Sequence, residues 1–488
     1  MKYILNPIYK LYLDKNRVLL LADADDGGYR CFIHPVYAII LSQFTGEFEI
    51  QTVYQQLADI FNKTSVEMEK IVKPFLQNKD VISFKYDGYV FSFPPLLLIK
   101  NKQNTIRKDL NLDSYAIKPP YDFETRRLNY PKHAMLIINT KCYTDCAYCY
   151  ADKEHKYETL PTKRIIEIIK EAKSIGINSF DLSGGEVLLH KDYDLIISEL
   201  LKQGYKPFIS TKVPIESEKI DKLWEIGLRQ IQISLESLNP FIQKNNLKVK
   251  EDYVPKIIKT IQKLDEKGFE IIIKSTCTKE TCTKENIEKL IEFINSLHHI
   301  VKYTFTPLGY SHYKSLDWYN ENKPNISMIN GIYEVIKQNK RKGYELEWDV
   351  DSIHYYEEYR NKESFDSRSI CTGNLSGFVI LPDGKVTICE ELYWNKNFII
   401  GDLSKQSILE VWNSPNAKNL WKLQQDNFPE DSACKYCDEF EHCRYIRGVC
   451  WKEVIAFYGN KNWLYPDPRC PKAPELNSTN KKLMYEKV

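Results

Sequence analysis

Three cysteines fall within eight positions of the segment NTKCYTDCAYCYADK, residues 139–153. They are Cys142, Cys146 and Cys149, separated by three and then by two residues. Thiolates at such spacings bind soft metals, but a structural zinc site needs four ligands, and no fourth Cys or His stands beside these three. Three thiolates on one loop suit a cubane iron–sulfur cluster better, because they ligate three irons and leave the fourth open to a small molecule.

The elements that must position this loop alternate between strand and helix from residue 133 to about 310. The pattern predicts about six βα units, too few for a closed eight-unit barrel but enough for a partial one. The expected strands are 133–140, 179–185, 206–212, 230–237, 270–278 and 301–309, and the expected helices are 162–176, 193–204, 217–227, 253–268 and 285–297.

Polar residues gather where these predicted strands end. Active sites of such sheets lie beyond the carboxyl ends of the strands, so we expect these residues to meet the cysteine loop there. They are Gly184, Gly185, Glu186, Thr211, Lys212, Ser234, Glu236 and Lys274. For each of the last five, an ordinary polar strand end is the alternative.

The cysteine spacing, with the aromatic Tyr148 before the third cysteine and Ser183-Gly-Gly-Glu186 after the next strand, resembles the radical S-adenosylmethionine (SAM) superfamily. The resemblance implies that the open iron chelates SAM. An electron from the cluster then cleaves the sulfonium, and the resulting 5′-deoxyadenosyl radical takes a hydrogen atom from the substrate, while the protein supplies placement and a dry cavity.

Roles for the other residues follow from the same resemblance. Gly184 and Gly185 would let backbone approach the methionyl amino group, with the Glu186 carboxylate nearby, and Tyr148 would lie near the adenine. Ribose and methionine contacts are expected from Thr211, Lys212, Ser234 and Glu236, and Lys274 could face the SAM carboxylate.

Seven more cysteines lie between residues 371 and 470: Cys371, Cys389, Cys434, Cys437, Cys443, Cys450 and Cys470. Their spacing, with a Pro382-Asp-Gly384 hairpin turn before Cys389, resembles the SPASM extension of radical SAM maturases, which carries two auxiliary 4Fe–4S clusters. The resemblance assigns Cys434, Cys437, Cys443 and Cys470 to an outer cluster, and Cys371, Cys389 and Cys450 to an inner one. Zinc ribbons are the alternative.

Two departures from the SPASM pattern concern the inner group. Six residues separate Cys443 from Cys450 where the family has three. Two cubanes need eight ligands and seven are present, so we expect an open or non-cysteine position that could bind a substrate thiolate. The remaining Cys31, Cys277 and Cys282 are expected to be structural, with a redox or ligand role as the alternative for the last two.

Residues 1–100 are predicted to form a separate small domain. Two strands, 10–22 and 29–33, flank the turn 23–28; helices follow at 35–44, 50–61 and 65–77, then a hairpin around Asp87-Gly88. This is the order of a winged helix-turn-helix. The domain holds 11 basic and 11 acidic residues, so peptide binding by strand addition is favoured over DNA binding.

The domain plan is therefore 1–100 for leader-peptide recognition, 101–130 as a linker, 131–310 as the partial α/β barrel, 311–370 as a bridging region and 371–488 as the auxiliary-cluster domain. The net charge of +2 points to neither nucleic acid nor membrane. The N-terminus resembles no signal or transit peptide, and thirteen cysteines without a disulfide pattern suit a reducing bacterial cytoplasm.

This arrangement resembles peptide maturases that modify ribosomally made precursors. We expect a peptide-modifying oxidoreductase with SAM and three 4Fe–4S clusters, a reductase, flavodoxin or ferredoxin as electron donor, and a cross-linked product, with a Cys-sulfur to carbon thioether favoured. The alternatives are carbon–carbon or carbon–oxygen cross-linking, a sulfatase-type formylglycine maturase, a metal-sensing winged-helix DNA-binding protein, and a zinc scaffold.

Overall fold

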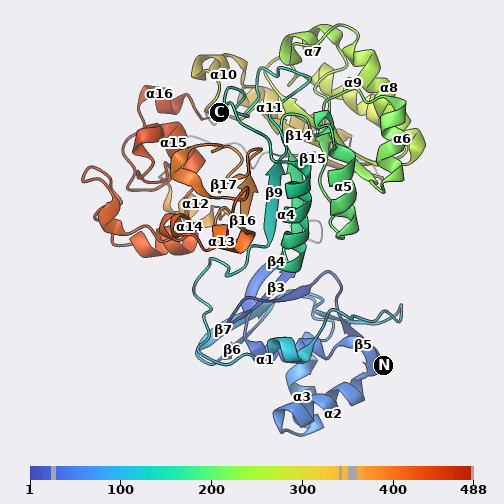
Figure 1. Cartoon of the computed structure of the whole chain (residues 1–488), viewed down its shortest axis with the longest axis vertical. Helices are drawn as coiled ribbons and strands as arrows, with labels where there is room; N and C mark the ends of the chain where they lie inside the picture. The colour runs from blue at the N-terminus through green and yellow to red at the C-terminus, as the bar shows by residue number, and fades with distance from the viewer. Residues whose placement is uncertain (23–28, 340–342, 350–359, 369, 485–488) are drawn as a thin grey trace. The chain divides into compact units, whose positions relative to one another are not determined.

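The computed structural model describes residues 1–22, 29–339, 343–349, 360–368 and 370–484. The chain divides into two compact units, Met1–Asn129 and Tyr130–Val488. The first is blue to cyan in Figure 1, and the second runs from green to red. Among the described residues, no helix is both long and apolar enough to cross a membrane.

The described residues of the N-terminal unit form three small antiparallel sheets and three α-helices. The sheets have the strand orders β5-β1-β8, β2-β3-β4 and β6-β7. The strands are β1 (Lys2–Leu5), β2 (Lys10–Leu13), β3 (Val18–Ala22), β4 (Tyr29–Ile33), β5 (Thr45–Glu49), β6 (Ile82–Tyr86), β7 (Tyr89–Phe93) and β8 (Leu98–Lys100), and the helices are α1 (Pro35–Ser42), α2 (Ile50–Phe61) and α3 (Ser65–Val72).

The three predicted helices and the hairpin are present. Tyr86 pairs with Tyr89, and the residues between them, Asp87 and Gly88, have φ of 49° and 82°. Two left-handed residues make the tight turn whose twist matches the flanking strands. The single strand predicted for 10–22 is two strands, and the predicted turn 23–28 lies outside the described residues. Assignment to the winged-helix class stays a prediction.

The linker was predicted for residues 101–130, and residues 101–129 of it are part of the N-terminal unit. Arg107 is buried, and its Nη1 donates hydrogen bonds of 3.2 Å to the carbonyl oxygens of both Leu5 and Tyr9. Leu128, near the end of the segment, is fully buried against β3. A segment that satisfies carbonyl groups and buries apolar side chains stabilises the unit it covers.

In the second unit, the described strands form two five-stranded sheets, ordered β10-β9-β16-β17-β18 and β11-β12-β13-β14-β15. All six predicted barrel strands are present and each pairs in parallel with a neighbour, while β15 is an addition within the expected bridging region. The strands are β9 (His133–Ile137), β10 (Ser179–Ser183), β11 (Ser210–Thr211), β12 (Gln230–Ser234), β13 (Glu270–Cys277), β14 (Ile300–Pro307), β15 (Glu345–Trp348), β16 (Gly377–Ile380), β17 (Lys385–Thr387) and β18 (Ile399–Asp402).

Helices follow the strands as predicted, and Figure 1 shows several of them along the outer side of the sheets. Most are amphipathic, so one face of each can bury apolar side chains against the strands. They are α4 (Thr162–Ser174), α5 (Tyr193–Lys202), α6 (Ser217–Glu225), α7 (Pro240–Leu247), α8 (Tyr253–Lys267), α9 (Lys284–Asn295), α10 (Leu316–Asn322), α11 (Ile326–Gln338), α12 (Lys362–Ser367), α13 (Ile408–Trp412), α14 (Pro415–Trp421), α15 (Trp451–Tyr458) and α16 (Ser478–Lys481).

The strand β16 joins the cysteine-rich C-terminal region to β9. It pairs in parallel with β9 from Gly377 opposite His133 to Ile380 opposite Leu136. A Cβ atom at Gly377 would lie 3.0 Å from both the Cβ and the carbonyl oxygen of His133, so the close approach of the two strands favours glycine. The predicted hairpin at Pro382–Gly384 is also present, between β16 and the antiparallel β17.

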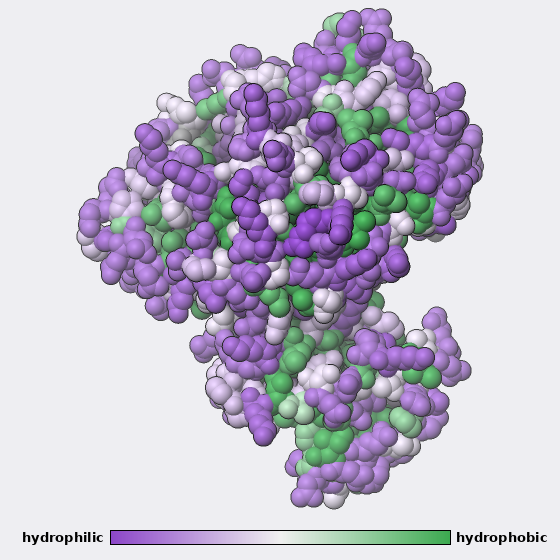
Figure 2. All heavy atoms as spheres, in the orientation of Figure 1, coloured by the Kyte–Doolittle hydropathy of each residue, from purple (hydrophilic) through white to green (hydrophobic). Residues whose placement is uncertain are grey.

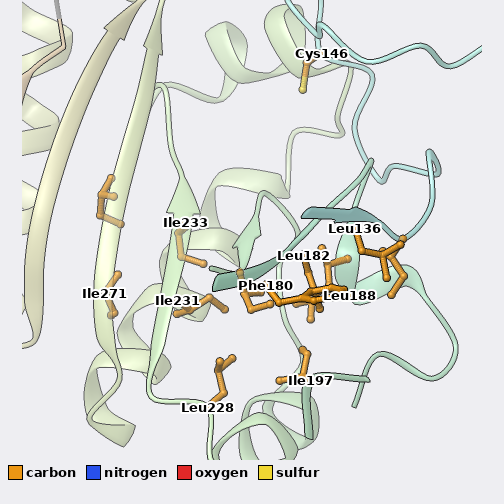
Figure 3. Close-up of a cluster of buried hydrophobic side chains, with 14 of the residues drawn as sticks. Leu136, Cys146, Phe180, Leu182, Leu188, Ile197, Leu228, Ile231, Ile233 and Ile271 are labelled. Atoms are coloured by element: carbon orange, nitrogen blue, oxygen red, sulfur yellow. The ribbon is translucent and has the colours of Figure 1, made fainter. Parts of the chain in front are cut away.

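The core of the second unit lies between the sheets and the helices that cover them. Figure 3 shows part of it, where Leu228 precedes β12, and Ile231 and Ile233 follow along the strand toward the end at which Cys146 lies. Each fully buried Leu or Ile contributes about 1.5–3 kcal/mol, so this region is a rigid support for the loops at the strand ends.

Candidate iron–sulfur and SAM site

The loop with Cys142, Cys146 and Cys149 follows β9, at the carboxyl end of the strand. Thr144 lies between the first two thiols, with its Oγ1 3.5 Å from Cys142 Sγ and 3.2 Å from Cys146 Sγ. The backbone N–H of Cys149 donates to the carbonyl oxygen of Cys146 at 3.1 Å. Backbone hydrogen bonds to the end of α7, including Asp145 N–H to Leu247 O at 2.9 Å, fix the loop from outside.

Gly184 and Gly185 lie against the chain that enters the cysteine loop. A Cβ at Gly184 would lie 2.6 Å from the carbonyl oxygen of Asn139, and a Cβ at Gly185 only 2.2 Å from that of Lys141. The Gly185 carbonyl oxygen is 3.5 Å from Cys142 Sγ. Both glycines are therefore required by the close approach of backbone to backbone. Their predicted contact with the methionyl amino group of SAM stays a prediction.

Glu186 connects the ends of β10 and β11, two strands that are not hydrogen-bonded to each other. Its buried carboxylate accepts hydrogen bonds from Leu188 N at 3.1 Å, Thr211 Oγ1 at 2.9 Å and Lys212 N at 3.3 Å. Burial raises the pKa of Glu186 to about 7, and the three hydrogen bonds offset only part of that rise. Because β10 and β11 belong to different sheets, Glu186 supplies a direct connection between their ends.

Lys212, Glu236 and Tyr148 form a buried polar triangle beside the cysteine loop. Lys212 Nζ donates to Glu236 Oε1 at 2.5 Å and to the Tyr148 hydroxyl at 3.2 Å. Burial alone would lower the pKa of Lys212, but the Glu236 carboxylate and the nearby Cys146 thiol raise it above its ordinary value. The ammonium group therefore stays charged next to the cysteines.

The second carboxylate oxygen of Glu236, Oε2, is buried and has no hydrogen-bond partner among the described residues. A buried acceptor without a donor is costly, so this oxygen is suited to a ligand hydroxyl or amino group. The nucleoside of SAM carries such donors. The buried Glu236 oxygen therefore fits a donor such as those of SAM, by a criterion that is independent of the cysteine spacing.

Ser234 and Lys274 are neighbours across β12 and β13. Ser234 Oγ accepts a hydrogen bond of 3.0 Å from Gln232 Nε2. The hydrogen bond from Lys302 lowers the pKa of Glu347, with a small contribution from the Lys274 charge, and burial raises the pKa of Glu390 against the opposing charge of Lys274. Within the described residues no hydrogen bond joins Ser234 or Lys274 to the Lys212 triangle, so their contacts with SAM stay a prediction.

The four cysteines assigned to the outer cluster line one cavity of about 180 Å³. In the described part of the chain, no three His, Cys, Asp or Glu side chains converge as ligands of a single metal ion. Thiols spread around a cavity fit a group larger than one ion, as a cubane is. The four are Cys434, Cys437, Cys443 and Cys470.

The three cysteines assigned to the inner cluster each accept a backbone N–H. The donors are Gly373 for Cys371, Glu391 for Cys389 and Glu453 for Cys450. Burial raises the pKa of the Cys389 and Cys450 thiols, and Cys371 adds to both shifts. The assignment of Cys450 to the inner cluster stays a prediction. Backbone N–H donors to sulfur are typical of iron–sulfur sites.

The remaining cysteines have structural surroundings. Cys277 and Cys282 are fully buried at the end of β13 and hydrogen-bond to each other, which together with burial raises the pKa of Cys277. Cys31 lies in β4 with its Sγ 3.5 Å from the carbonyl oxygen of Ser92.

Two hydrogen-bonded pairs of side chains beside the cysteine groups were not predicted from the sequence. The Tyr150 hydroxyl donates to Glu390 Oε2 at 3.0 Å, and Lys452 Nζ donates to Glu391 Oε1 at 2.7 Å. The sequence indicates such a role for Tyr150 and Glu390 only through their positions, because each directly follows a cysteine, Cys149 and Cys389 respectively.

Comparison with known families places two models on these segments. The radical SAM superfamily model matches residues 136–297, and the SPASM iron–sulfur cluster-binding domain matches residues 371–438. The chain contains a radical SAM domain and a SPASM domain. Such domains bind SAM and iron–sulfur clusters, and the first match includes the loop of Cys142, Cys146 and Cys149.

Similar proteins share one or both of these domains. The chain is 28% identical over 165 residues to a probable GTP 3′,8-cyclase of Archaeoglobus fulgidus, an alignment that spans 33% of this chain but only 54% of the cyclase. It is 23% identical over 331 residues to the antilisterial bacteriocin subtilosin biosynthesis protein AlbA of Bacillus subtilis, spanning 65% of this chain and 68% of AlbA. The radical SAM domain is thus shared widely, and the AlbA alignment extends beyond it.

The crystal structure of Streptococcus suis SuiB bound to SAM has the same fold. The superposition covers 96% of this chain and 99% of SuiB at a TM-score of 0.62, with 16% sequence identity. SuiB bound to its precursor peptide SuiA superposes with a TM-score of 0.60.

Proposed function

We propose that the chain is a peptide maturase that uses SAM-derived radical chemistry to cross-link a ribosomally made precursor peptide. The observation that carries this proposal is the combination of a three-cysteine loop, two SPASM cysteine groups and an N-terminal unit with an open groove. AlbA is named for bacteriocin biosynthesis, and the SuiB structure holds a precursor peptide, so peptides are the substrate class common to these two relatives.

Three 4Fe–4S clusters would be held by the cysteines described above, and the cluster on Cys142, Cys146 and Cys149 would supply the 5′-deoxyadenosyl radical from SAM. Glu236 Oε2 would accept a hydrogen bond from the ribose, and Tyr148 would lie against the adenine. Lys212 holds both of these side chains in place through its two hydrogen bonds. A reductase, flavodoxin or ferredoxin would deliver the first electron.

We favour a thioether as the bond formed. Seven SPASM cysteines leave the inner group one thiolate short of a full set, and that position could receive the thiolate of a peptide cysteine. A carbon–carbon or carbon–oxygen cross-link would use the same hydrogen abstraction, and mass spectrometry of alkylated product distinguishes them, because only a thioether consumes a free thiol.

The leader of the precursor would dock on the N-terminal unit. An apolar groove of about 390 Å³ runs between α1, α3 and β6, and β6 pairs with β7 alone among the described strands. An extended peptide could therefore add as a strand to its free edge. The groove is lined by Val36, Tyr37, Ile40, Phe61, Lys63, Met68, Lys70, Ile71, Pro74, Phe75, Phe84, Lys85 and Tyr86, and the surface of this unit shows hydrophobic residues among hydrophilic ones in Figure 2.

The charges around the groove suggest the kind of leader that fits. Three lysines and no carboxylate are among its lining residues, although the unit as a whole is close to neutral. A leader with apolar side chains and flanking Asp or Glu would complement both features.

The first experiment tests the chemistry. The anaerobically reconstituted chain should hold about twelve irons, four per cubane, and should cleave SAM with dithionite. Cys142→Ala should abolish this cleavage and lose about a third of the iron. Zinc without visible absorption, or full cleavage by the variant, would reject the proposal.

The second experiment tests docking. Lys70→Glu combined with Lys85→Glu should weaken precursor binding about tenfold or more, since each reversal costs about 1 kcal/mol at a solvent-exposed site. SAM cleavage without peptide should be retained. Lys108→Glu, an equally exposed lysine outside the groove, is the matched control. Equal affinity in all three proteins would reject docking at this groove.

A further inference from the structure

Arg444 lies between the two SPASM cysteine groups. It is one of the residues that line the cavity of the outer cysteines, and it also lines a smaller cavity of about 40 Å³ that contains Cys371. The residue belongs to a π-helical turn, His442–Arg447, that also carries Cys443. Such turns are rare and frequent at functional sites.

The guanidinium of Arg444 is buried, with only 8% of the residue exposed. Its Nη2 donates to Cys434 Sγ at 3.0 Å and to the carbonyl oxygen of Tyr465 at 3.0 Å. Its Nε and Nη1 are buried and have no hydrogen-bond partner among the described residues. Phe428 and Trp451 cover the group, with ring centroids 4.8 and 5.2 Å from Cζ.

No described carboxylate forms an ion pair with Arg444, although a buried charge without a counter-charge is strongly destabilising. Four thiolates around a cubane carry net negative charge. The buried guanidinium with two unused donors therefore points to an anionic group in the adjoining cavity.

Two of the other outer cysteines also lie near positive charge. Lys472 Nζ is 3.5 Å from Cys437 Sγ, and the buried Arg368 has its Nη2 3.8 Å from Cys443 Sγ.

Carboxylates lie near both cysteine groups. Asp467 lines the outer cavity, whereas Glu390 and Glu391 act on Cys389, and Glu453 acts on Cys450, beside the Lys452 ammonium. The two groups differ in their donors: the outer group receives guanidinium donors, and the inner cysteines receive backbone N–H groups.

We propose that Arg444 raises the reduction potential of the outer auxiliary cluster above that of the inner one. Hydrogen bonds to the sulfurs and nearby positive charge stabilise the reduced form, whereas nearby carboxylates destabilise it. An electron released when the cross-link closes would leave the inner cluster oxidised and the outer cluster reduced, with no proton moved between them. Arg444 is a positioning residue in this scheme, because it touches neither substrate nor SAM.

This inference rests on the proposed cluster-binding function, and its test does not use peptide activity. The full-length reconstituted chain is titrated with reductant under EPR detection. Arg444→Gln should shift the outer cluster to a more negative potential, while Arg444→Lys, which keeps the charge, should shift it less. Lys435→Gln is the control, because Lys435 follows Cys434 but its ammonium is paired with Glu430 and donates to the carbonyl oxygen of Asp426.

An outer-cluster potential in Arg444→Gln equal to that in Lys435→Gln would overturn the proposal. If Arg444→Gln loses about a third of its iron, Arg444→Lys provides the deciding measurement. Iron content restored in Arg444→Lys supports the need for a positive charge at this position, whereas iron content that is not restored overturns the proposal in favour of a packing role for the guanidinium. A chain that cleaves SAM but leaves every precursor unmodified would reject the maturase function and leave this result standing, whereas zinc uptake, read by metal analysis, would overturn both.

Discussion

The hydroxyl of Tyr150 donates a hydrogen bond of 3.0 Å to Glu390 Oε2. These residues directly follow Cys149 in the radical SAM domain and Cys389 in the SPASM domain. One hydrogen bond thus fixes the loop of Cys142, Cys146 and Cys149 relative to the loop that carries Cys389, across 240 positions of sequence. Tyr150 is still 41% exposed, so this link lies on a surface that solvent, or a substrate, can reach.

Tyr150→Phe should loosen this link without removing a ligand. A hydrogen bond to a charged group contributes about 1.5–3 kcal/mol, so the two loops should separate more often. We expect full iron content and SAM cleavage without peptide, but several-fold less cross-linked product per SAM cleaved, measured by mass spectrometry. An unchanged amount of cross-linked product per SAM cleaved would show that the Tyr150–Glu390 hydrogen bond has no role in the reaction.

Gly185→Ala should damage the SAM-binding cluster selectively. The added Cβ would meet Lys141 O at 2.2 Å, and backbone atoms cannot yield as a flexible side chain can. Overpacking costs about 1–3 kcal/mol, here within the cysteine loop. We expect loss of about four irons, with the auxiliary EPR signals retained.

Gly331→Ala is the matched control for this substitution. Gly331 lies inside α11, and a Cβ atom added to it would meet no other atom within 4 Å, so alanine there should stabilise the helix slightly. Equal iron content in the two variants would contradict the steric argument.

Glu186 should make stability depend on pH near neutrality. Its pKa is raised from 4.5 to about 7 in the folded chain, so the folded state binds more protons than the unfolded state between these values. Stability therefore falls as pH rises through this window, by about 3 kcal/mol in total, and levels off above it.

Glu186→Gln should remove this dependence, because glutamine does not titrate. Urea unfolding of the reconstituted protein at pH 5, 6, 7 and 8 measures the difference between the two proteins. Parallel pH profiles would indicate that Glu186 titrates normally.

The N-terminal unit should need residues 101–129 to fold. A fragment of residues 1–129 retains the hydrogen bonds of Arg107 to the carbonyl groups of Leu5 and Tyr9, and a fragment ending at residue 100 loses them together with the buried Leu128. We expect cooperative thermal unfolding for the longer fragment and a lower Tm, or no transition, for the shorter one. Identical transitions would mean that 101–129 contributes nothing.

Much of this molecule is readable from local sequence. The alternating strands and helices of the barrel, the Asp87-Gly88 hairpin and the clustered cysteines all depend on spacing over a few residues. The pairing of β16 with β9 is not readable this way, because it joins segments more than 200 positions apart. The polar segment 101–129 lacks any periodic pattern, since it is held by Arg107 and by single buried residues rather than by an apolar face.

The candidate site likewise has parts that can be predicted from local sequence and parts that cannot. The cysteines and the Ser183–Glu186 turn follow from motif spacing, whereas the roles of individual side chains depend on three-dimensional neighbours. Glu186 connects strand ends and the glycines accommodate backbone, and neither role is visible without the fold. Arg444 belongs to no recognisable sequence motif. Its role is indicated only by its burial and by its position between two cavities.

The pairing of β9 with β16 limits which domains of such proteins can be exchanged. Because β16 completes the sheet that begins the radical SAM domain, a graft of a foreign SPASM region would have to bring a strand that fits His133 as closely as Gly377 does. The N-terminal unit has a core and a covering segment of its own. If the leader docks on this unit as proposed, we expect an exchange of residues 1–129 to direct the same radical chemistry toward a different peptide.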